Sequence, residues 1–197
     1  MRVVAGEARG RQLQAPPGRK TRPTSDRVRE AIFNVLGSLT AIEGIVVADL
    51  FAGSGALGIE ALSRGAARVV FVDADRQATS TIRTNLARTG LARTGLTRTG
   101  LAGPQAEVVQ ADVLRWLGGG GAGGDPPHID LALCDPPYAF ADWPTLLDRL
   151  APVSGMVVLE SGSSGTSGAP LEPGPEWEVL RVKRYGGTVV TVARPER

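Results

Sequence analysis

Short apolar runs alternate with helical segments from residue 45 onward, and this alternation constrains the fold more than any other feature of the chain. The runs are rich in β-branched residues and occupy residues 45–50, 69–72, 108–109, 129–133 and 156–159. Such runs are typical of strands buried on both faces of a parallel sheet that helices cover. Two later runs, 178–184 and 188–192, flank Gly186 and Gly187 and predict an antiparallel hairpin at the sheet edge. The sequence therefore predicts an α/β fold.

The first 40 residues show a different pattern and are expected to form an N-terminal extension. Residues 1–5 and 10–14 predict a small hairpin. Thr24 or Ser25 is the expected cap of a helix whose apolar positions recur at helical spacing, namely Val28, Ile32, Phe33, Val35 and Leu36. We expect residues 1–40 to be this extension and residues 41–197 to be the main domain, together forming one compact unit.

Composition excludes several classes of protein. Hydrophobic residues make up 42% and charged residues 21% of the 197 residues, which excludes a wholly disordered chain. No apolar run approaches the roughly 20 residues that span a bilayer, and the first residues lack the apolar region of a secretory signal. One cysteine, Cys134, and one histidine, His128, argue against a metal site. We expect a cytoplasmic protein without a metal.

Positive charge is concentrated at the start of the chain. Residues 1–29 hold eight Arg or Lys residues against two acidic ones, a net charge of +6, whereas the remainder carries −4. A basic arm suits a polyanionic partner, although a solvated basic face would give the same count. The residues predicted to contact nucleic acid are Arg9, Arg11, Arg19, Lys20, Arg22, Arg27 and Arg29.

Three stretches are expected to be surface loops. Residues 86–103 repeat the sequence LARTG with small changes, which indicates a local duplication that lengthens the loop after a helix. Residues 118–124 are glycine except for Ala122, and residues 161–168 contain only Ser, Gly and Thr.

A glycine-rich loop follows the first predicted strand. Gly53, Gly55 and Gly58 fit the pattern G-x-G-x-x-G, and Asp73 ends the next strand twenty positions after Gly53. Glycines allow the backbone to approach a ligand, a helix N-terminus offers N–H groups, and the acid accepts hydrogen bonds from ribose hydroxyls. This layout predicts a nucleotide-containing cofactor, either a nicotinamide dinucleotide or S-adenosylmethionine.

Asp49 favours S-adenosylmethionine over a dinucleotide. An acid four residues before the first glycine suits the cationic amino acid end of S-adenosylmethionine, whereas it would repel a pyrophosphate. Asp112 follows the third run. Its side chain could accept a hydrogen bond from the adenine amino group or cap a helix, and the two roles can coexist.

The sequence Asp135-Pro136-Pro137-Tyr138 follows the fourth run and so belongs to the same edge of the sheet as the glycine-rich loop. The Asp135 carboxylate and the Pro136 carbonyl offer two acceptors to the two hydrogens of an exocyclic amine, and Tyr138 offers a flat face for a flipped base. Neither a metal nor a covalent intermediate is needed. Cys134 lies inside the apolar run and is interpreted as a small buried residue rather than a nucleophile.

These motifs resemble the RsmD family of bacterial enzymes, which methylate N2 of a guanine in 16S ribosomal RNA of the small subunit. The resemblance rests on residues 22–34, 49–61 and 185–188 and on the Asp135–Tyr138 motif. It implies a Rossmann-like class I methyltransferase fold with a seven-stranded, mostly parallel sheet, and S-adenosylmethionine as cofactor. The cofactor-binding residues that we predict are Thr24, Asp49, Phe51, Gly53, Ser54, Gly55, Gly58, Asp73, Asp112 and Val113.

Three alternatives stay open at this point. A DNA adenine-N6 methyltransferase, or another amino-methyltransferase of ribosomal RNA, would use the same motif at Asp135–Tyr138. An oxidoreductase would need a catalytic device that one histidine and two lysines do not supply. A binding protein without activity would not need that motif intact. We expect a monomer that acts on the small ribosomal subunit, without a membrane partner.

Overall fold

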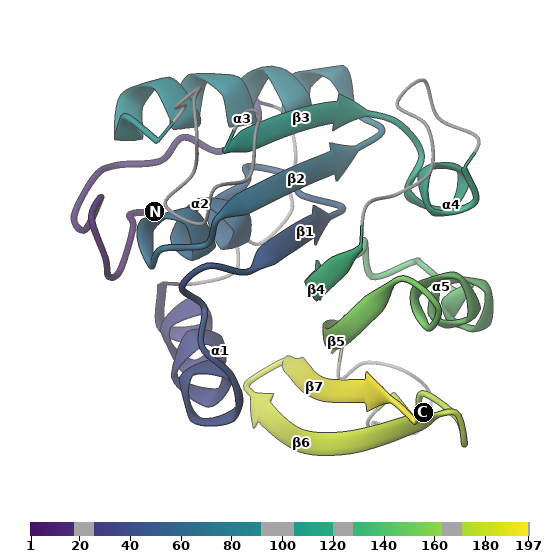
Figure 1. Ribbon diagram of the computed structural model, residues 1–197. Coiled ribbons are helices and arrows are strands. Elements are labelled where there is room, and N and C mark those ends of the chain that lie inside the picture. The colour runs from purple at the N-terminus through teal and green to yellow at the C-terminus, as the bar shows by residue number, and fades with distance from the viewer. Residues whose placement is uncertain (18–25, 92–104, 120–127, 163–170, 197) are drawn as a thin grey trace.

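The described residues form one seven-stranded sheet in the order β3-β2-β1-β4-β5-β7-β6 (Figure 1). This computed structural model describes residues 1–17, 26–91, 105–119, 128–162 and 171–196. The strands are β1 (Val46–Leu50), β2 (Arg68–Asp73), β3 (Ala106–Gln110), β4 (Ile129–Cys134), β5 (Ser154–Gly162), β6 (Trp177–Tyr185) and β7 (Thr188–Pro195). β1 to β5 pair in parallel, and β7 pairs antiparallel with both β5 and β6. The predicted parallel sheet and terminal hairpin are confirmed.

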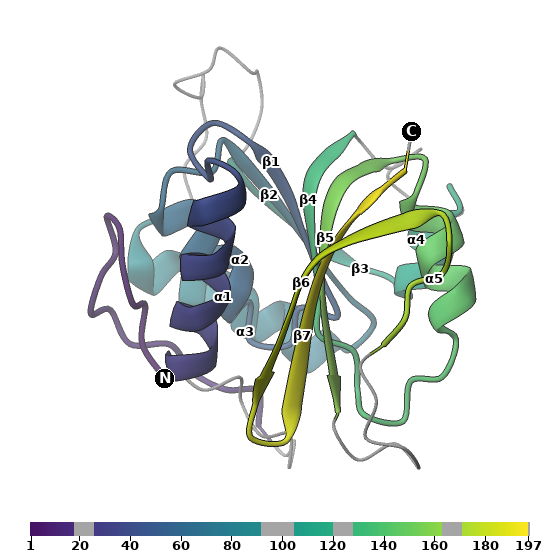
Figure 2. The ribbon, with the colours of Figure 1, turned by 90° about the horizontal axis from the view of Figure 1, so that it is seen from below.

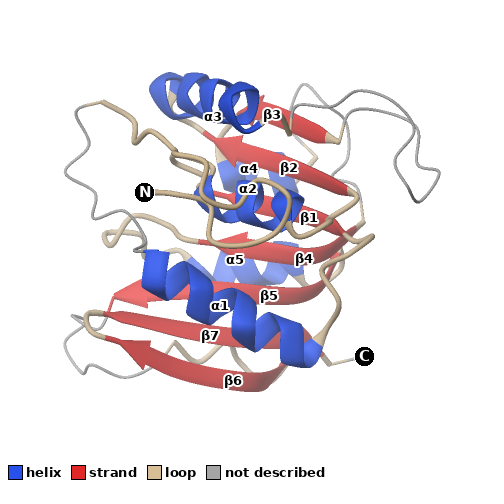
Figure 3. Ribbon diagram, turned by 90° about the vertical axis from the view of Figure 1, so that its left-hand side faces the viewer, coloured by secondary structure: helices blue, strands red, loops and turns tan. Residues whose placement is uncertain are grey.

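Helices cover both faces of the sheet. They are α1 (Asp26–Leu39), α2 (Ala56–Ser63), α3 (Arg76–Thr89), α4 (Val113–Leu117) and α5 (Trp143–Leu150). α1, α2 and α3 lie on one face, and α4 and α5 lie on the other (Figures 2 and 3). This three-layer arrangement is the Rossmann-like class I fold that the sequence pattern and the family resemblance predicted.

Alternate residues of each strand fill two separate cores. Val47 of β1 and Val69 of β2 belong to the core under α1 to α3, whereas their neighbours Ala48 and Val70 belong to the core under α4 and α5. Side chains of a strand point alternately to its two faces, so a strand buried on both sides must be apolar throughout. This requirement explains why the runs in the sequence are unbroken.

The first residues form a small antiparallel hairpin and join the core beneath α1 to α3. Arg2 bridges Gln12, and the Val3 amide donates to the Arg11 carbonyl at 3.0 Å. Val3 and Leu13 are buried in the same core as the sheet residues. The carboxylate of Glu60 on α2 accepts from the amides of Val4 and Ala5 at 2.7 and 2.9 Å, so α2 holds the hairpin in place.

Two of the predicted loops begin too early. Ser161 and Gly162 extend β5 by pairing with Val189 and Thr188 of β7. The first LARTG unit is also helical, because residues 86–89 form the last turn of α3 with Leu86 buried, and Gly90 ends the helix at a φ of 73°. An apolar residue that meets the core fixes this turn, and a left-handed glycine then stops the helix. The proposed caps Thr24 and Ser25, and the rest of the repeat after Leu91, lie outside the described residues. No helix in the described part of the chain is long and apolar enough to cross a bilayer.

Candidate active site

The glycine-rich loop and the Asp135–Tyr138 motif meet at one edge of the sheet. Leu50, the last residue of β1, pairs with Cys134, the last residue of β4. The segments that follow these two strands therefore leave the sheet side by side. In open α/β sheets this edge, beyond the carboxyl ends of the strands, is where ligands bind.

The loop after β1 takes backbone conformations that most residues avoid. Gly53 and Gly55 have φ values of 55° and 74°, and Phe51 has a φ of 58°, the only positive value of a non-glycine residue in the described chain. A left-handed conformation costs a bulky residue about 1–3 kcal/mol, and such strain is concentrated at ligand sites. Gly55 caps α2 without a side-chain hydrogen bond. The backbone conformation of this loop, at the start of α2, is therefore compatible with the predicted close approach of a ligand.

Gly58 has a packing role in this structure. A Cβ at this position would lie 2.3 Å from Cε1 of Phe71 and 2.9 Å from Cγ1 of Val69. Its amide donates to Oδ2 of Asp49 at 2.8 Å. Gly58 thus allows α2 to pack tightly on β2 and orients the Asp49 carboxylate, and its amide is already engaged within the protein.

Asp49 is a buried acid beneath the glycine-rich loop, with 2% of its surface exposed. Burial raises the pKa of this carboxyl well above its usual value, the hydrogen bond from Gly58 opposes the rise, and the negative charges of Asp135 and Asp73 add to it. Burial and the neighbouring negative charges both disfavour the ionised form of Asp49. A cation bound beside it would stabilise that form. The site therefore fits a ligand with a cationic end.

Asp73 links the end of β2 to the same loop. Its Oδ2 accepts from the Gly53 amide and its Oδ1 accepts from the Asp75 amide, both at 2.8 Å. These two bonds fix the Asp73 carboxylate at the carboxyl end of β2, next to the glycine-rich loop. The prediction that Asp73 binds the ribose is compatible with this geometry.

The Asp135–Tyr138 motif forms a turn at the end of β4. Asp135 is half-buried, Pro136 is buried, and Tyr138 is 71% exposed. The Pro137 carbonyl accepts from the Phe140 amide at 2.8 Å, which closes the turn. Asp135 and Pro136 thus stand at the site as two acceptors, and Tyr138 presents its ring to solvent beside them.

Cys134 is a buried thiol, as the sequence predicted. Burial raises its pKa far above the usual value, and the charges of Asp49 and Asp135 raise it further. The nucleophilic form of cysteine is the thiolate, which this environment disfavours. Cys134 is therefore unsuited to attack a substrate.

Asp112 caps α4, because its Oδ1 accepts from the Arg115 amide at 2.9 Å. The capping role is confirmed, and contact with adenine stays a prediction that this role does not exclude. The side chain of Val113 is 2% exposed and packs in the core under α4 and α5. A cofactor contact by Val113 would therefore come from its backbone.

The structure corrects one member of the predicted RNA-binding set. Arg9, Arg11 and Arg27 are exposed, as a contact with phosphate requires. Arg29 is fully buried, donates to Oδ1 of Asp26 at 2.8 Å and lies 3.6 Å from Oε2 of Glu60. The prediction that Arg29 contacts RNA is wrong, because its helical position points into the core and its charge is used to hold α1 against α2. Thr24, Arg19, Lys20 and Arg22 lie outside the described residues.

Three aromatic rings connect the glycine-rich loop to the segment that follows the Asp135–Tyr138 motif, and two of them, Phe140 and Trp143, were not predicted from the sequence. Phe51 packs edge-on against Phe140 with ring centroids 5.1 Å apart, and Phe140 packs edge-on against Trp143 at 5.3 Å. Such pairs contribute about 0.5–1.5 kcal/mol each beyond burial. The only signal in the sequence was an aromatic residue two positions after Tyr138.

Glu160 is a further acid that sequence reasoning missed. Leu159 pairs with Cys134, so Glu160 lies beside Asp135 on the neighbouring strand. Glu160 is 4% exposed, and its Oε1 has no hydrogen-bond partner among the described residues. Burial raises its pKa well above the usual value, the charges of Asp135 and Asp49 add to the rise, and Arg29 opposes it. The site is therefore strongly acidic, which favours cationic or hydrogen-donating ligands.

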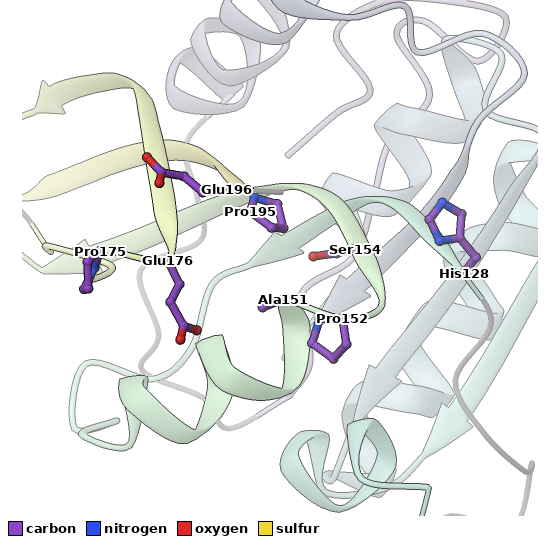
Figure 4. A pocket seen from close by; sticks show the side chains of 8 residues that line it. All are labelled: His128, Ala151, Pro152, Ser154, Pro175, Glu176, Pro195 and Glu196. Carbon is purple, nitrogen blue, oxygen red and sulfur yellow. The ribbon is translucent and has the colours of Figure 1, made fainter.

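A separate pocket lies at the opposite edge of the sheet (Figure 4). Its volume is about 610 Å³, and its walls include His128, Ser154, Glu176 and Glu196. Ser154 pairs with Ile129, the first residue of β4, so this pocket is at the amino ends of the central strands. It is distinct from the site around Asp49 and Asp135. No group of acids, His and Cys that could hold a metal ion occurs within the described ranges.

Comparison with known proteins identifies the family. The family described as "Conserved hypothetical protein 95" matches residues 1–194. The chain belongs to this family. Ribosomal RNA small subunit methyltransferase D of Escherichia coli is 33% identical over 189 residues, which cover 94% of this chain and 85% of that protein. The protein of the same name from Haemophilus influenzae is 36% identical over 140 residues, 71% of this chain and 65% of that protein. The chain thus spans just under two thirds of the length of the Haemophilus member.

Solved structures share the fold of this family member. The Escherichia coli protein yhhF superimposes with a TM-score of 0.75 at 29% identity, covering 100% of this chain and 98% of that one. Magnesium protoporphyrin IX methyltransferase from Synechocystis, solved with bound S-adenosylmethionine, superimposes with a TM-score of 0.64 at 12% identity, covering 86% of this chain and 79% of that one. The second likeness shows the fold alone. The seven-stranded arrangement is therefore that of the class I methyltransferases.

Proposed function

We propose that this protein transfers a methyl group from S-adenosylmethionine to the exocyclic N2 amine of a guanine in the 16S RNA of the small ribosomal subunit. One observation carries the proposal: the loop that fits the methyl donor and the motif that fits an amine leave neighbouring strands, since Leu50 pairs with Cys134. Family membership supports the substrate class, because relatives in the family are named ribosomal RNA small subunit methyltransferases.

The residues around the glycine-rich loop fit the donor. Asp49 is a buried acid beneath the loop, suited to a cationic amino group, and Asp73 places a carboxylate beside Gly53, where a ribose hydroxyl would donate to it. Gly53 and Gly55 let the loop approach the ligand closely at the start of α2. When bound, S-adenosylmethionine supplies an electrophilic methyl group on a sulfonium centre.

Asp135 and Pro136 supply the chemistry on the acceptor side. An aromatic amine is a weak nucleophile because its lone pair is delocalised into the ring. Two acceptors on its N–H bonds favour a more tetrahedral nitrogen and direct its lone pair toward the methyl group. As the new nitrogen–carbon bond forms, the bond from the methyl carbon to the sulfonium sulfur breaks, and positive charge passes to the nitrogen. The Asp135 carboxylate would stabilise this charge and accept the proton that the nitrogen then loses.

The basic arm is proposed to hold the RNA. Arg9, Arg11 and Arg27 are exposed and can neutralise phosphates while one base is flipped toward Tyr138. We propose that the protein acts as a monomer in the cytoplasm, where small subunits are assembled.

The test is transfer of labelled methyl to three substrates, followed by nucleoside analysis: small subunits that lack the modification, free ribosomal RNA, and DNA. The proposal predicts N2-methylguanosine in ribosomal RNA. N6-methyladenine in DNA would replace this proposal with the adenine-N6 activity. Tight donor binding without transfer to any of the three would also contradict it.

A further inference from the structure

The outer strand β6 ends at the same edge of the sheet as the active site. β6 is antiparallel to β7, and β7 is antiparallel to β5, so β6 runs parallel to β5. Tyr185 at the end of β6 pairs with Thr188, which in turn pairs with Gly162 at the end of β5. Figure 3 shows the arrowheads of β5 and β6 on the same side of the molecule. The last residues of β6 therefore belong to the edge that carries Asp135 and Tyr138.

Charge changes sign along this strand. The charged residues at its start are acidic: Glu176 stands just before the strand, and Glu178 within it forms an ion pair with Arg194 at 2.6 Å. The charged residues of its second half are all basic and exposed, namely Arg181, Lys183 and Arg184. The cations thus cluster at the end that lies near the active site, and the acids lie at the far end.

Two of these cations project from the face of the sheet that α1 covers. Arg181 pairs with Val192 and Lys183 pairs with Val190, and both valines belong to the core under α1 to α3. α1 lies across β5 and β7 on this face, and its first turn is on the side of the molecule where β5 and β6 end (Figure 3). The exposed Arg27 belongs to that turn, so its charge adds to those of β6 on the same side of the molecule.

We infer that the second half of β6, through Arg181 and Lys183 together with Arg184, is an RNA-binding surface that holds phosphates next to the target nucleotide. This inference rests on the proposed function and adds to it a surface on the outermost strand β6, three positions from β4 in the sheet. Charge complementarity selects the partner, since three exposed cations in four positions suit a polyanion, and the exposed ring of Tyr138 at the same edge suits a base.

A simpler explanation is that the charges keep an edge strand from pairing with other sheets. Lys and Arg are common at sheet edges for this reason. Acidic residues would protect the edge equally well, whereas they would repel phosphates. Reversal of the charges therefore separates the two explanations.

The experiment compares two double variants with the same change of net charge. Arg181→Glu/Lys183→Glu alters β6, and Arg83→Glu/Arg88→Glu alters exposed positions of α3, which packs beside β3 at the other end of the sheet. Binding to labelled 16S ribosomal RNA is measured directly as a function of salt, without methyl transfer. S-adenosylmethionine binding and far-UV circular dichroism show that each variant is folded. Arg181→Gln/Lys183→Gln serves in place of the β6 reversal if that variant does not fold.

The inference predicts that the β6 reversal weakens RNA binding at least about tenfold and lowers the slope of log affinity against log salt by about 1.4, for two lost phosphate contacts. The α3 reversal should change affinity less than about threefold. The inference would be overturned if both variants weakened RNA binding equally, or if neither variant weakened it. Because binding is read without catalysis, a wild-type protein that binds RNA through β6 yet transfers no methyl would count against the proposed function alone.

Discussion

The carboxamide of Asn85 on α3 forms a closed pair of hydrogen bonds with the backbone of Gln14. Its Oδ1 accepts from the Gln14 amide at 2.9 Å, and its Nδ2 donates to the Gln14 carbonyl at 3.0 Å. The same Nδ2 donates to the Ser54 carbonyl at 2.9 Å, in the glycine-rich loop. One fully buried side chain thus ties the end of the N-terminal hairpin to the predicted cofactor loop.

Asn85→Ala should lower the free energy of unfolding by about 2–4 kcal/mol, because it removes three part-buried hydrogen bonds to the backbone of Gln14 and Ser54. Affinity for S-adenosylmethionine should fall as well, since the loop loses its anchor. Urea denaturation and isothermal titration calorimetry measure the two effects. Thr84→Ala is the control, because Thr84 directly precedes Asn85 in α3 and is exposed. This variant should change the free energy of unfolding by less than about 0.5 kcal/mol. A variant at Asn85 as stable as this control would contradict the anchoring role.

Gly58→Ala should destabilise the protein by about 1–3 kcal/mol, since the new methyl group would overlap the Phe71 ring against a packed core. Gly37→Ala is the matched control, because Gly37 is an exposed position of α1 with no heavy atom within 4 Å of its added Cβ. That control should gain about 1 kcal/mol from helix propensity. Thermal unfolding compares the two, and the same sign of effect in both variants would refute the packing argument.

Asp49→Asn should weaken S-adenosylmethionine binding at least about tenfold, because the amide keeps an acceptor for Gly58 but loses the charge that faces the ligand. The same variant has a pH signature. Burial raises the pKa of Asp49 in the folded protein above the ordinary 3.8. Above pH 3.8 the folded protein therefore holds a proton that the unfolded chain has lost, and the free energy of unfolding of the wild type falls as the pH rises toward the folded-state pKa. Asp49→Asn does not show this fall in stability, because an amide does not titrate.

Its stability relative to wild type should therefore increase between pH 4 and pH 7, as measured by urea denaturation at both values. A constant difference across this range would show that Asp49 titrates normally in the folded protein.

Cys134→Ala should retain methyl transfer within about threefold, since the buried thiol has no part in the reaction. The loss of one buried sulfur should cost about 1–2 kcal/mol of stability. Iodoacetamide should leave the native wild-type protein unmodified and label it only in denaturant. Loss of transfer in a folded variant would point instead to a covalent mechanism.

The central sheet could be predicted from the sequence because each strand buried on two faces must be apolar throughout. The runs at 45–50 and 129–133 correspond to β1 and β4 within one residue at each end. Ser161 and Gly162 could not be assigned to β5 from their own composition, because their strand character comes from pairing with β7. Pairing between distant segments does not leave a local pattern.

The candidate site could be predicted where a short motif contains the residue types that a reaction needs, as Asp135–Tyr138 does. It could not be predicted where contacts between distant segments determine whether a side chain is buried or lies at the site. Arg27 and Arg29 contribute equally to the basic charge of the N-terminal residues, but their positions around α1 differ. Arg29 points into the core, whereas Arg27 is exposed to solvent. Glu160 was also missed, since only the pairing of β4 with β5 brings it beside Asp135.

The most direct test of the account measures donor binding and methyl transfer in the same two variants. Asp135→Ala should leave the dissociation constant of S-adenosylmethionine within about threefold of wild type and reduce transfer to small subunits at least about a thousandfold, because only the acceptor side loses its charge. Asp73→Ala should weaken donor binding at least about tenfold, since it removes the acceptor beside Gly53. An equal loss of donor affinity in both variants would contradict the separate roles of the two sites.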